Sequence, residues 1–405
     1  YDVQVASDAA FTSIQFSATV VATSATTSAL LDGLYYWRVR SRDRAGNLSA
    51  WSATRSFTVD ATKGFYVGLG VGGDGRIAPF QKASAGYAAR PLYQLPWSAN
   101  GETRPAAGNF HGDGRAELVV GFGRFPGATG GYLALLSDSG SGFSVQRWIR
   151  IPWTSYNAAN GESWPACGDI DGDGSDEIVV GLGTYTPAGG YFCVFEDASA
   201  NYAPILWGRV SWSVYNSMDG QTRPAVGDLD GDGASEVLIG LGSYPGQGGY
   251  LQRFTDQTVA PVTPNGWLRL SWVAYNAANG ETWPACGDVD GDGRAEVCIG
   301  LGAYPAAGGY VQYRDDAAAG FAPIAWKRLP WTPYNAASGE TRPSLGRMAA
   351  APGAQTVIGL GRNAGADGWA AIYDRAPGFG VLGWRQVSDG AYNSSNGETR
   401  PSVGR

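Results

Sequence analysis

Short apolar segments recur along most of the chain, and residues that favour turns bound each of them. The segment E-I-V-V-G-L-G at 177–183 is an example, with Asp-Gly-Asp-Gly before it and a Gly-Gly pair after it. Val and Ile enrichment between clusters of Gly, Pro, Asn and Asp favours β-strands. No segment keeps a sustained 3.6-residue apolar period, so the pattern predicts an all-β protein.

The apolar segments belong to a longer repeat. The string G-E-T-R-P-A-A-G-N-F-H-G-D-G-R-A-E-L-V-V-G-F-G at 101–123 returns with changes at 161–183, 220–242 and 280–302, and in a more altered form at 339–361. Equivalent positions lie 59 or 60 residues apart, at Glu117, Glu177, Glu236, Glu296 and Gln355. Each unit divides into four short strands, which is typical of the blades of a β-propeller.

Counting the strands predicts six blades and a closed ring. The second strand of the unit occurs six times, at 65–70, 118–123, 178–183, 237–242, 297–302 and 356–361. The first strand also occurs six times, at 103–109, 163–169, 222–228, 282–288, 341–347 and 399–405. The repeats begin with a second strand and end with a first strand, so the last strand is expected to complete the first blade. We therefore predict a six-bladed propeller over residues 64–405.

Residues 1–60 follow a different pattern. They alternate apolar and polar residues, as the strands of an antiparallel sandwich do. The stretch Y-Y-W-R-V-R-S-R-D-R-A-G-N-L-S-A-W-S at 35–52 resembles the late strands of a fibronectin type III domain. This resemblance implies a partial β-sandwich without its opening strands. Either the sequence is a fragment of a longer polypeptide, or a partner supplies the missing strands, which would allow self-assembly.

The loop between the first and second strands carries acidic residues at fixed spacing, D-x-D-G-D-G-x-x-E. Glycines permit a tight reversal that brings positions 1, 3, 5 and 9 together, and carboxylate oxygens are the ligands that Ca²⁺ prefers. A polar hairpin turn, the alternative, needs one Gly and one Asp or Asn rather than four acids. Three loops are intact: Asp169, Asp171, Asp173 and Glu177; Asp228, Asp230, Asp232 and Glu236; Asp288, Asp290, Asp292 and Glu296.

Two further copies of this loop are altered. One keeps Asn109, Asp113 and Glu117 and has His111 at the third position, which makes it a weaker candidate for a fourth calcium site. The other, from Arg347 to Gln355, has lost all its acids. The sequence therefore predicts Ca²⁺ at three loops, with a fourth site as an open alternative.

These loops, followed by E-V-x-I-G-L-G, resemble the FG-GAP/VCBS repeats of integrin α-subunit propellers and of many secreted bacterial proteins. The resemblance covers residues 64–405 and departs from the family pattern at the fifth repeat and in having six units. It implies that calcium braces each blade on the face opposite the ligand-binding loops. The three acidic quartets would then have a structural role and no catalytic one.

A second motif, W-x-x-Y-N-x-x-x-G-E-T-R/W-P, joins each fourth strand to the next first strand. Its aromatic and amide side chains could hold sugars by stacking and hydrogen bonding, or they could pack between blades. Because the motif is repeated in every blade, packing is the favoured interpretation. The candidate ligand-binding residues are Trp153, Tyr156, Asn157, Trp212, Tyr215, Asn216, Trp272, Tyr275, Asn276, Trp331, Tyr334 and Asn335.

The residue before the motif's Pro forms a further repeated position. It is expected to form a ring around the channel mouth, either as a hydrated rim or as an anion or glycan site. The ring consists of Arg104, Trp164, Arg223, Trp283, Arg342 and Arg400.

Composition narrows the possible partners. The 29 basic and 36 acidic residues give a net charge of −7 without a basic cluster, which argues against nucleic acid or an anionic membrane. No run of about 18 apolar residues exists, so no membrane span is predicted. The single histidine excludes mechanisms that need two imidazoles. Cys286 and Cys298 flank one predicted hairpin and are either buried thiols or a disulfide.

No catalytic set stands out from the repeat background, so we expect a protein that is not an enzyme. The sequence predicts an extracellular, secreted or cell-surface propeller, stabilised by calcium, that serves as an adhesion, binding or fibre-forming element. Its expected partners are protein or glycan ligands at the cell surface. The alternative is a multivalent carbohydrate-binding lectin that uses the W-x-x-Y-N loops.

Overall fold

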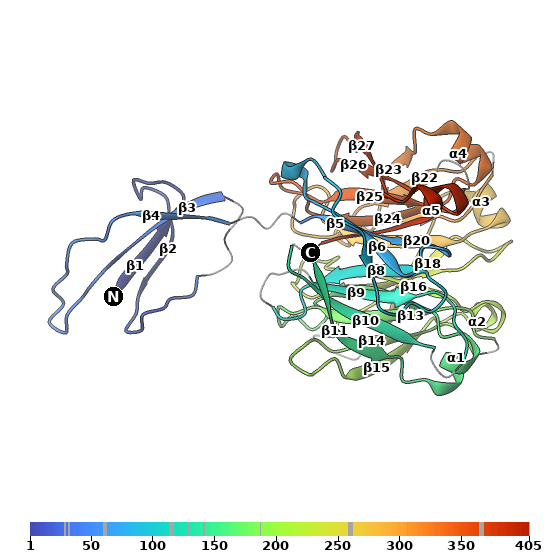
Figure 1. Ribbon diagram of the computed structural model, residues 1–405, viewed down its shortest axis with the longest axis horizontal. Helices are drawn as coiled ribbons and strands as arrows, with labels where there is room; N and C mark the ends of the chain where they lie inside the picture. The colour runs from blue at the N-terminus through green and yellow to red at the C-terminus, as the bar shows by residue number, and fades with distance from the viewer. Residues whose placement is uncertain are drawn as a thin grey trace. The chain divides into compact units, whose positions relative to one another are not determined.

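The computed structural model describes residues 1–27, 30, 33–59, 63–112, 117–127, 130–140, 142–186, 188–257, 262–305, 307–363 and 368–404. Contacts divide the chain into two compact units, Tyr1–Thr62 and Lys63–Arg405. The described residues form seven four-stranded antiparallel sheets and a few short helices (Figure 1), which confirms the predicted all-β class. Within the described ranges, every helix falls short of the length and apolar character that crossing a bilayer requires.

The first unit contains one sheet, with strand order β2-β1-β3-β4. Its strands are β1 (Asp2–Ala6), β2 (Ile14–Thr19), β3 (Gly33–Arg40) and β4 (Arg55–Val59). Val3, Val5 and Val39 line one side of this sheet, while Arg38 and Arg40 stack on Trp51 and bind Gln4 and Asp2. The fibronectin-like assignment of this unit stays a prediction.

The second unit contains the other six sheets, which we call blades and name by the first strand given for each. The strands run in the order β8 (Thr103–Gly108), β9 (Glu117–Phe122), β10 (Tyr132–Asp138), β11 (Phe143–Arg150); β12 (Ser163–Gly168), β13 (Glu177–Leu182), β14 (Tyr191–Phe195), β15 (Pro204–Arg209); β16 (Thr222–Gly227), β17 (Glu236–Leu241), β18 (Tyr250–Phe254), β19 (Pro264–Arg269); β20 (Thr282–Gly287), β21 (Glu296–Leu301), β22 (Tyr310–Arg314), β23 (Pro323–Arg328); β24 (Thr341–Gly346), β25 (Gln355–Leu360), β26 (Trp369–Tyr373), β27 (Val381–Gln386); and β28 (Thr399–Val403), β5 (Phe65–Leu69), β6 (Arg76–Phe80), β7 (Tyr93–Gln94).

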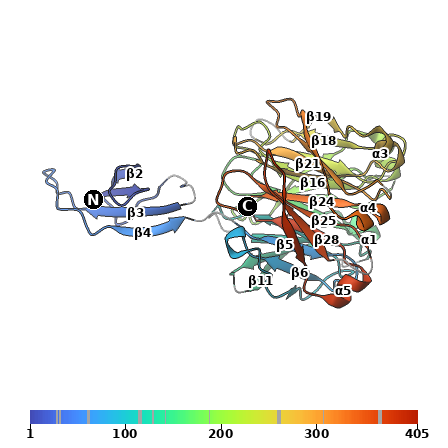
Figure 2. The same cartoon turned by 90° about the horizontal axis from the view of Figure 1, so that it is seen from above.

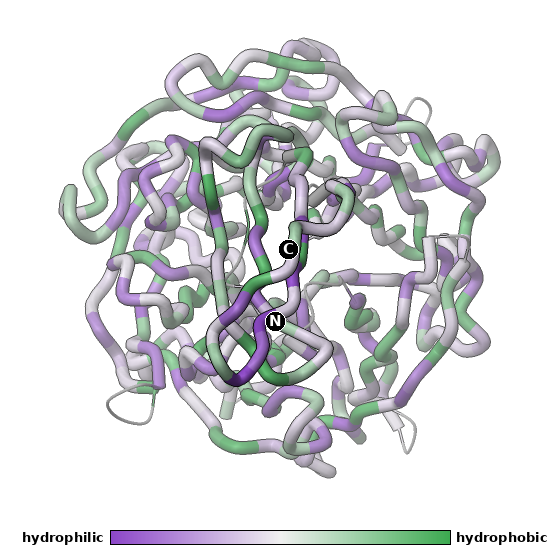
Figure 3. Tube along the Cα trace, turned by 90° about the vertical axis from the view of Figure 1, so that its left-hand side faces the viewer, coloured by the Kyte–Doolittle hydropathy of each residue, from purple (hydrophilic) through white to green (hydrophobic). Residues whose placement is uncertain are grey.

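The first strands form the inner wall of a ring. β8, β12, β16, β20, β24 and β28 contact one another in this order, and β28 contacts β8 in turn, which closes the circle of blades seen in Figure 3. In Figure 2 the C-terminal strand β28 lies beside β5, and the two pair antiparallel from Thr399–Leu69 to Val403–Phe65. A channel of about 140 Å³ at the centre is lined by the Pro-Ala type segments of all six inner strands. This arrangement is that of a β-propeller.

Glycine and threonine at fixed repeat positions explain how closely the blades pack. A Cβ atom at Gly181 in β13 would overlap the carbonyl oxygen of Thr222 in the next blade, so no larger residue fits there. The Thr222 hydroxyl accepts a hydrogen bond of 2.7 Å from the main-chain N–H of Leu182. The same pair of contacts recurs around the ring, with Thr103, Ser163, Thr282, Thr341 and Thr399 in the place of Thr222.

In the described part of the chain, five short helices connect successive blades, and the strand-based prediction did not include them. They are α1 (Thr154–Ala159), α2 (Ser213–Met218), α3 (Val273–Ala278), α4 (Thr332–Ala337) and α5 (Gly390–Ser395). Figure 1 shows them together at one end of the unit, opposite the loops that join first and second strands. A 3₁₀ turn at Ala83–Ala85 lies between β6 and β7.

Candidate metal centres and blade junctions

The three intact acidic loops share one local fold, which the last acid of each loop holds in place. Its carboxylate accepts a hydrogen bond from the main-chain N–H of the residue after the first Asp, and that residue is a fully or almost fully buried aliphatic side chain. The three pairs are Ile170 N–H to Glu177 Oε2 (2.7 Å), Leu229 N–H to Glu236 Oε2 (2.7 Å) and Val289 N–H to Glu296 Oε2 (2.6 Å). The loop thus presents its aspartates toward a fixed glutamate.

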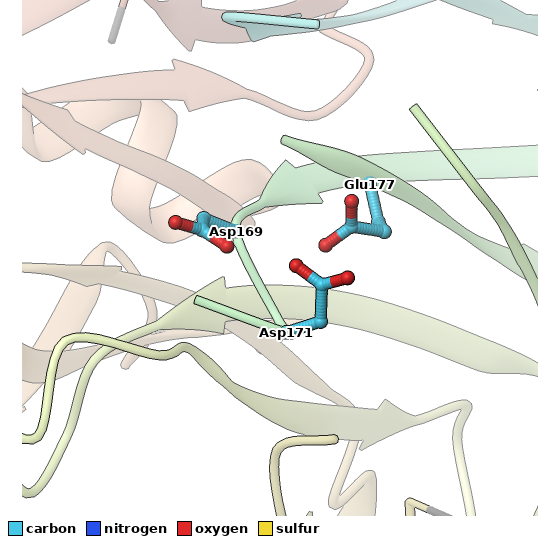
Figure 4. Close-up of side chains that lie close together, drawn as sticks. All are labelled: Asp169, Asp171 and Glu177. Carbon is cyan, nitrogen blue, oxygen red and sulfur yellow. The ribbon is translucent and has the colours of Figure 1, made fainter. Parts of the chain in front are cut away.

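In the first loop the carboxylates converge on one point (Figure 4). One oxygen from each of Asp169, Asp171 and Glu177 lies within 4.8 Å of the other two. Calcium binds oxygen at 2.3–2.6 Å, so two oxygens on the same ion lie at most about 5 Å apart. Asp169 also accepts N–H bonds from Gly172 and Gly174, but a carboxylate oxygen has a second lone pair for a cation.

An acid from a neighbouring hairpin joins two of the loops, and sequence reasoning missed it. Asp197, between β14 and β15, groups with Asp173 and Glu177, and Asp316, between β22 and β23, groups with Asp292 and Glu296. Both added aspartates are buried. The repeated pattern G-G-Y-x-x-x-x-x-D, which ends on these aspartates, was the available signal. The additional carboxylates bring each of these sites closer to the six to eight oxygens that Ca²⁺ takes.

Two buried carboxylate oxygens provide an independent test of whether a cation fits. Glu177 and Glu296 are fully buried, and the Oε1 atom of each has no hydrogen-bond partner within the described part of the chain. Burial, with repulsion from the neighbouring aspartates, raises the pKa of Glu177 to about 9 and of Glu296 to about 8. An unpaired buried charge is costly, and a divalent cation held by the same oxygens would remove that cost.

The second loop brings its three aspartates together. Asp228, Asp230 and Asp232 each place an oxygen within 4.8 Å of the others. Burial, together with repulsion from Asp230, Asp256 and Asp228, raises the pKa of Glu236 to about 8. Asp256 is the last residue of the G-G-Y-x-x-x-x-x-D pattern in this blade, the position that Asp197 and Asp316 occupy in theirs. The donor set of this loop therefore also suits a hard divalent cation.

The two altered loops keep the hydrogen bond to their last residue, with different chemistry. In the first, Phe110 N–H donates to Glu117 Oε2 (2.9 Å), while His111 Nδ1 contacts the other oxygen of Glu117. Asn109 accepts at its carbonyl from Asp176 N–H (2.9 Å), and Asp113 lies outside the described residues. In the other, the neutral Gln355 amide oxygen accepts from Met348 N–H (2.8 Å). The first altered loop therefore places an imidazole against its glutamate, and the other has a neutral amide in place of the glutamate.

The tyrosines and asparagines of the W-x-x-Y-N motif lie inside the protein. Tyr215 is fully buried, and its hydroxyl donates to Gln221 O (2.6 Å) and accepts from Gly242 N–H (2.7 Å). Asn216 donates to Val210 O (2.7 Å) and is 2% exposed. The equivalent pairs are Tyr156 and Asn157, Tyr275 and Asn276, and Tyr334 and Asn335, which are buried in the same way. A ligand cannot reach these groups, so their arrangement fits the packing interpretation.

Replacing Tyr215 by Phe should destabilise the protein although the ring still fits its site. The change removes the hydroxyl partner of the buried Gly242 N–H and of the part-buried Gln221 C=O, which costs about 1–3 kcal/mol. Urea unfolding of the variant measures this loss. Tyr244→Phe is the matched control, because the Tyr244 hydroxyl contacts only the Met218 sulfur at 3.6 Å among the described residues and its loss should change stability by no more than about 0.5 kcal/mol. Equal stability of the two variants would contradict the prediction.

The tryptophans of the motif, by contrast, are only half-buried, and each lies at the junction between two blades. Trp272, just before α3, meets Tyr304, Tyr310 and Trp326 of the next blade at centroid distances of 5.4, 5.3 and 5.8 Å. Trp153, Trp212 and Trp331 lie in equivalent places. Of the candidate ligand-binding residues, these four tryptophans are the ones that reach the surface.

The ring of residues before proline is neither a hydrated rim nor an anion site, which corrects both sequence interpretations. Arg104, Arg223 and Arg400 are buried, and Trp164 and Trp283 meet across the axis edge to face at 5.1 Å. Each arginine, Arg342 included, is ion-paired with a glutamate: Arg104–Glu162, Arg223–Glu281, Arg342–Glu340 and Arg400–Glu102, all at 2.6 Å. The guanidiniums stack on the two tryptophans, so this layer closes the channel.

None of the four cysteines forms a disulfide. Cys286 pairs in register with Val297, and Cys298 pairs with Ala285, so the two thiols lie on opposite faces of the blade. Cys286 lines the central channel, and Cys298 lies in the core between blades. The 286–298 disulfide that the hairpin spacing left open is therefore absent.

Comparison with solved structures finds similar folds at low sequence identity. A periplasmic gluconolactonase of Pseudomonas aeruginosa matches 99% of this chain and 98% of its own, with 12% identity and a TM-score of 0.47. The Dos1 propeller matches 78% of this chain and 66% of its own, with 10% identity and a TM-score of 0.39. A rhamnogalacturonan lyase of Bacillus licheniformis matches 95% of this chain, with 14% identity and a TM-score of 0.39.

This chain spans less than two thirds of the rhamnogalacturonan lyases that it resembles, 58% to 64% of their length. No protein-family model and no curated protein sequence matches the chain. At such identities and TM-scores, a similarity identifies no shared chemistry. What the chain can do must be argued from its own residues.

Proposed function

We propose that this chain is an extracellular, calcium-stabilised six-bladed β-propeller, related to FG-GAP/VCBS repeat proteins, that acts as an adhesion, binding or fibre-forming module and not as an enzyme. One observation carries the proposal: three loops with the same acidic spacing bring carboxylates together, and two of their buried glutamates, Glu177 and Glu296, each have an oxygen without a hydrogen-bond partner among the described residues. Calcium outside cells is abundant enough to fill such sites permanently. A structural ion of this kind suits a secreted or cell-surface protein.

The even repeat supports a binding role rather than catalysis. Acids along the inner ring are ion-paired with arginines, and the acids of the loops face one another at fixed spacing in successive blades. In the intact loops, the carboxylates would hold the ion, and the main-chain N–H bonds to Asp169, Asp228 and Asp288 would keep them oriented. The bound ion would supply positive charge that fixes each loop against the next blade.

Calcium stoichiometry tests this proposal directly. The chain should bind three Ca²⁺, and Asp171→Ala, Asp230→Ala and Asp290→Ala should each remove about one ion, because each aspartate belongs to a separate cluster. Isothermal titration and metal analysis after gel filtration measure the number bound. Arg347→Ala, in the loop without acids, is the control and should leave the count unchanged. Fewer than two ions on the unchanged chain would contradict the proposal.

The cell-surface part of the proposal needs a separate experiment. Protease applied to intact source cells in calcium-containing buffer should remove the chain, whereas cytoplasmic marker proteins should survive. Beads coated with the purified chain should attach to cell surfaces or extracellular polymers, and chelation should weaken the attachment. A chain that is protected in intact cells, or beads that attach no better than beads coated with albumin, would refute a surface binding role.

A further inference from the structure

The half-buried tryptophans at the blade junctions form a repeated surface feature, because part of each side chain stays exposed after it has packed against the next blade. At four junctions, the tryptophan before the next blade meets the aromatic residue that opens the third strand and the tryptophan of the fourth strand, and we call this group an aromatic corner. The four corners are Trp97, Tyr132 and Trp148; Trp153, Tyr191 and Trp207; Trp212, Tyr250 and Trp267; and Trp272, Tyr310 and Trp326. A fifth junction keeps the two tryptophans, Trp331 and Trp384.

The sixth junction breaks this pattern and provides an internal comparison. Asp389 takes the place of the first tryptophan, and Leu92 takes the place of the fourth-strand tryptophan. Asp389 forms an ion pair with Arg76 instead of an aromatic contact. The junction is closed by charge pairing, so blade packing itself does not require the aromatic corner.

Two neighbouring aromatic corners each line an open cavity, and the two cavities have similar lining residues. A cavity of about 310 Å³ is lined by Ser211, Trp212, Gln247, Tyr250 and Trp267. A cavity of about 360 Å³ is lined by Ser271, Trp272, Ala307, Tyr310, Trp326 and Arg328. Volumes in this range lie at the lower end of the roughly 300–1,000 Å³ found for small-molecule sites. Both combine aromatic walls with polar groups at the rim.

The walls and the rim have different chemistry. In the larger cavity the rings of Trp272 and Trp326 are perpendicular, at an interplanar angle of 90°, so they form a corner instead of stacking on one another. Arg328 donates through Nε to Gly308 O (3.1 Å), and its guanidinium lies 5.0 Å from the Tyr310 ring centre. Arg269 is placed in the same way over Tyr250, at 4.6 Å. The site offers an apolar corner beside fixed hydrogen-bond donors.

We infer that these two cavities bind the pyranose rings of a glycan, one ring in each. A pyranose has an apolar C–H face that packs against an indole ring, and equatorial hydroxyls that need polar partners such as Ser271 and Arg328. A guanidinium already lies over the tyrosine of each corner, so a cationic ligand would meet like charge there. The inference rests on the proposed function as a binding module and names its ligand class.

Binding assays on the full chain in calcium test the inference. A glycan array identifies the sugars retained, and calorimetric titration follows with D-glucose, D-galactose, D-mannose, N-acetyl-D-glucosamine and D-glucuronate. The unchanged chain should bind at least one of these sugars. Trp267→Ala and Trp326→Ala should each weaken binding at their own cavity by about tenfold or more, and the double variant should lose both sites. Leu92→Ala, at the equivalent strand position of the polar junction, should bind as the unchanged chain does.

Three results would overturn the inference: no sugar bound on the array and in the titrations, binding unaffected by the double variant, or the same loss in Leu92→Ala. Circular dichroism and thermal melting in calcium check that each variant is folded. Where Trp326→Ala is not folded, Arg328→Ala at the exposed rim tests the same cavity. Failure here is distinct from failure of the proposed function, because calcium stoichiometry and calcium-dependent melting are measured without sugar.

Discussion

In a buffer with excess chelator, the chain should melt on the order of 10 °C below its melting temperature in calcium, and added Ca²⁺ should restore the difference. Each ion that binds the folded state alone adds about 2.7 kcal/mol at a hundredfold excess over Kd. Three sites together would then contribute about 8 kcal/mol, which is comparable with the roughly 5–15 kcal/mol net stability of a typical domain. Differential scanning calorimetry in calcium and in chelator measures the shift.

The effect should extend beyond the loops because each intact loop is bonded to the next blade. The carbonyl oxygens of Asp169, Asp228 and Asp288 accept N–H bonds from Ser235, Ala295 and Ala354, at 2.6, 2.6 and 2.5 Å. The next residue also takes part, since Gln257 N–H donates to Ile170 O at 2.7 Å. A loop that loses its ion therefore loosens a blade junction as well as its own turn.

Two controls separate a calcium effect from a general effect of salt or chelator. A variant with Asp171, Asp230 and Asp290 all changed to Ala should melt at the same temperature with and without chelator. Magnesium at the same concentration should restore less stability, because Mg²⁺ demands a near-octahedral site and gives up its water reluctantly. Identical melting curves of the unchanged chain in chelator and in calcium would refute a stabilising role for the ion.

The sequence predicted the parts of the fold that depend on local pattern and on repetition. Val/Ile-rich segments between glycines marked the strands, and the regular spacing from Glu117 to Gln355 marked the units. The pairing of β28 with β5 followed from the order of strands at the two ends of the repeat array. The acidic loops were also visible, because all their members lie within nine residues of one another.

Features that depend on neighbouring blades or on short-range packing were not predicted. Asp197 and Asp316 join their clusters only through the hairpin that follows, about 20 residues after the last loop acid. Helices such as α2 span six residues, too few to show a 3.6-residue period, and depend on the buried Tyr215 for their position. The two tryptophans that close the channel, Trp164 and Trp283, come from blades separated by another blade, and only the curvature of the ring brings them together.

Removal of residues 399–405 should have the largest effect of any change on the second unit, with loss of cooperative folding and aggregation of the purified chain. The deletion takes away β28, the inner strand of its blade, and exposes the edges of β5 and of the β24 and β8 blades. It also removes hydrogen bonds to both neighbours: Ser402 Oγ accepts from Ala107 N–H (2.9 Å), and Val403 N–H donates to Ser344 Oγ (3.0 Å). Light scattering and calorimetry measure the outcome.

Because the deleted chain is expected not to fold, a point variant and a rearranged chain make the closure testable in folded protein. Arg400 forms ion pairs with Glu102 and Glu398, each at 2.6 Å, inside the closed ring. Arg400→Ala removes this buried partner from both carboxylates, so the free energy of unfolding should fall by about 3–5 kcal/mol. Gly404 N–H donates to Gly64 O at 3.0 Å, so the two ends of the unit are adjacent. A permutant of residues 63–404 that joins 404 to 63 and opens between Ser199 and Ala200, in an exposed turn, should fold with stability close to that of 63–404 in native order. A deletion that leaves melting unchanged, or a permutant that cannot fold, would show that β28 does not close the ring.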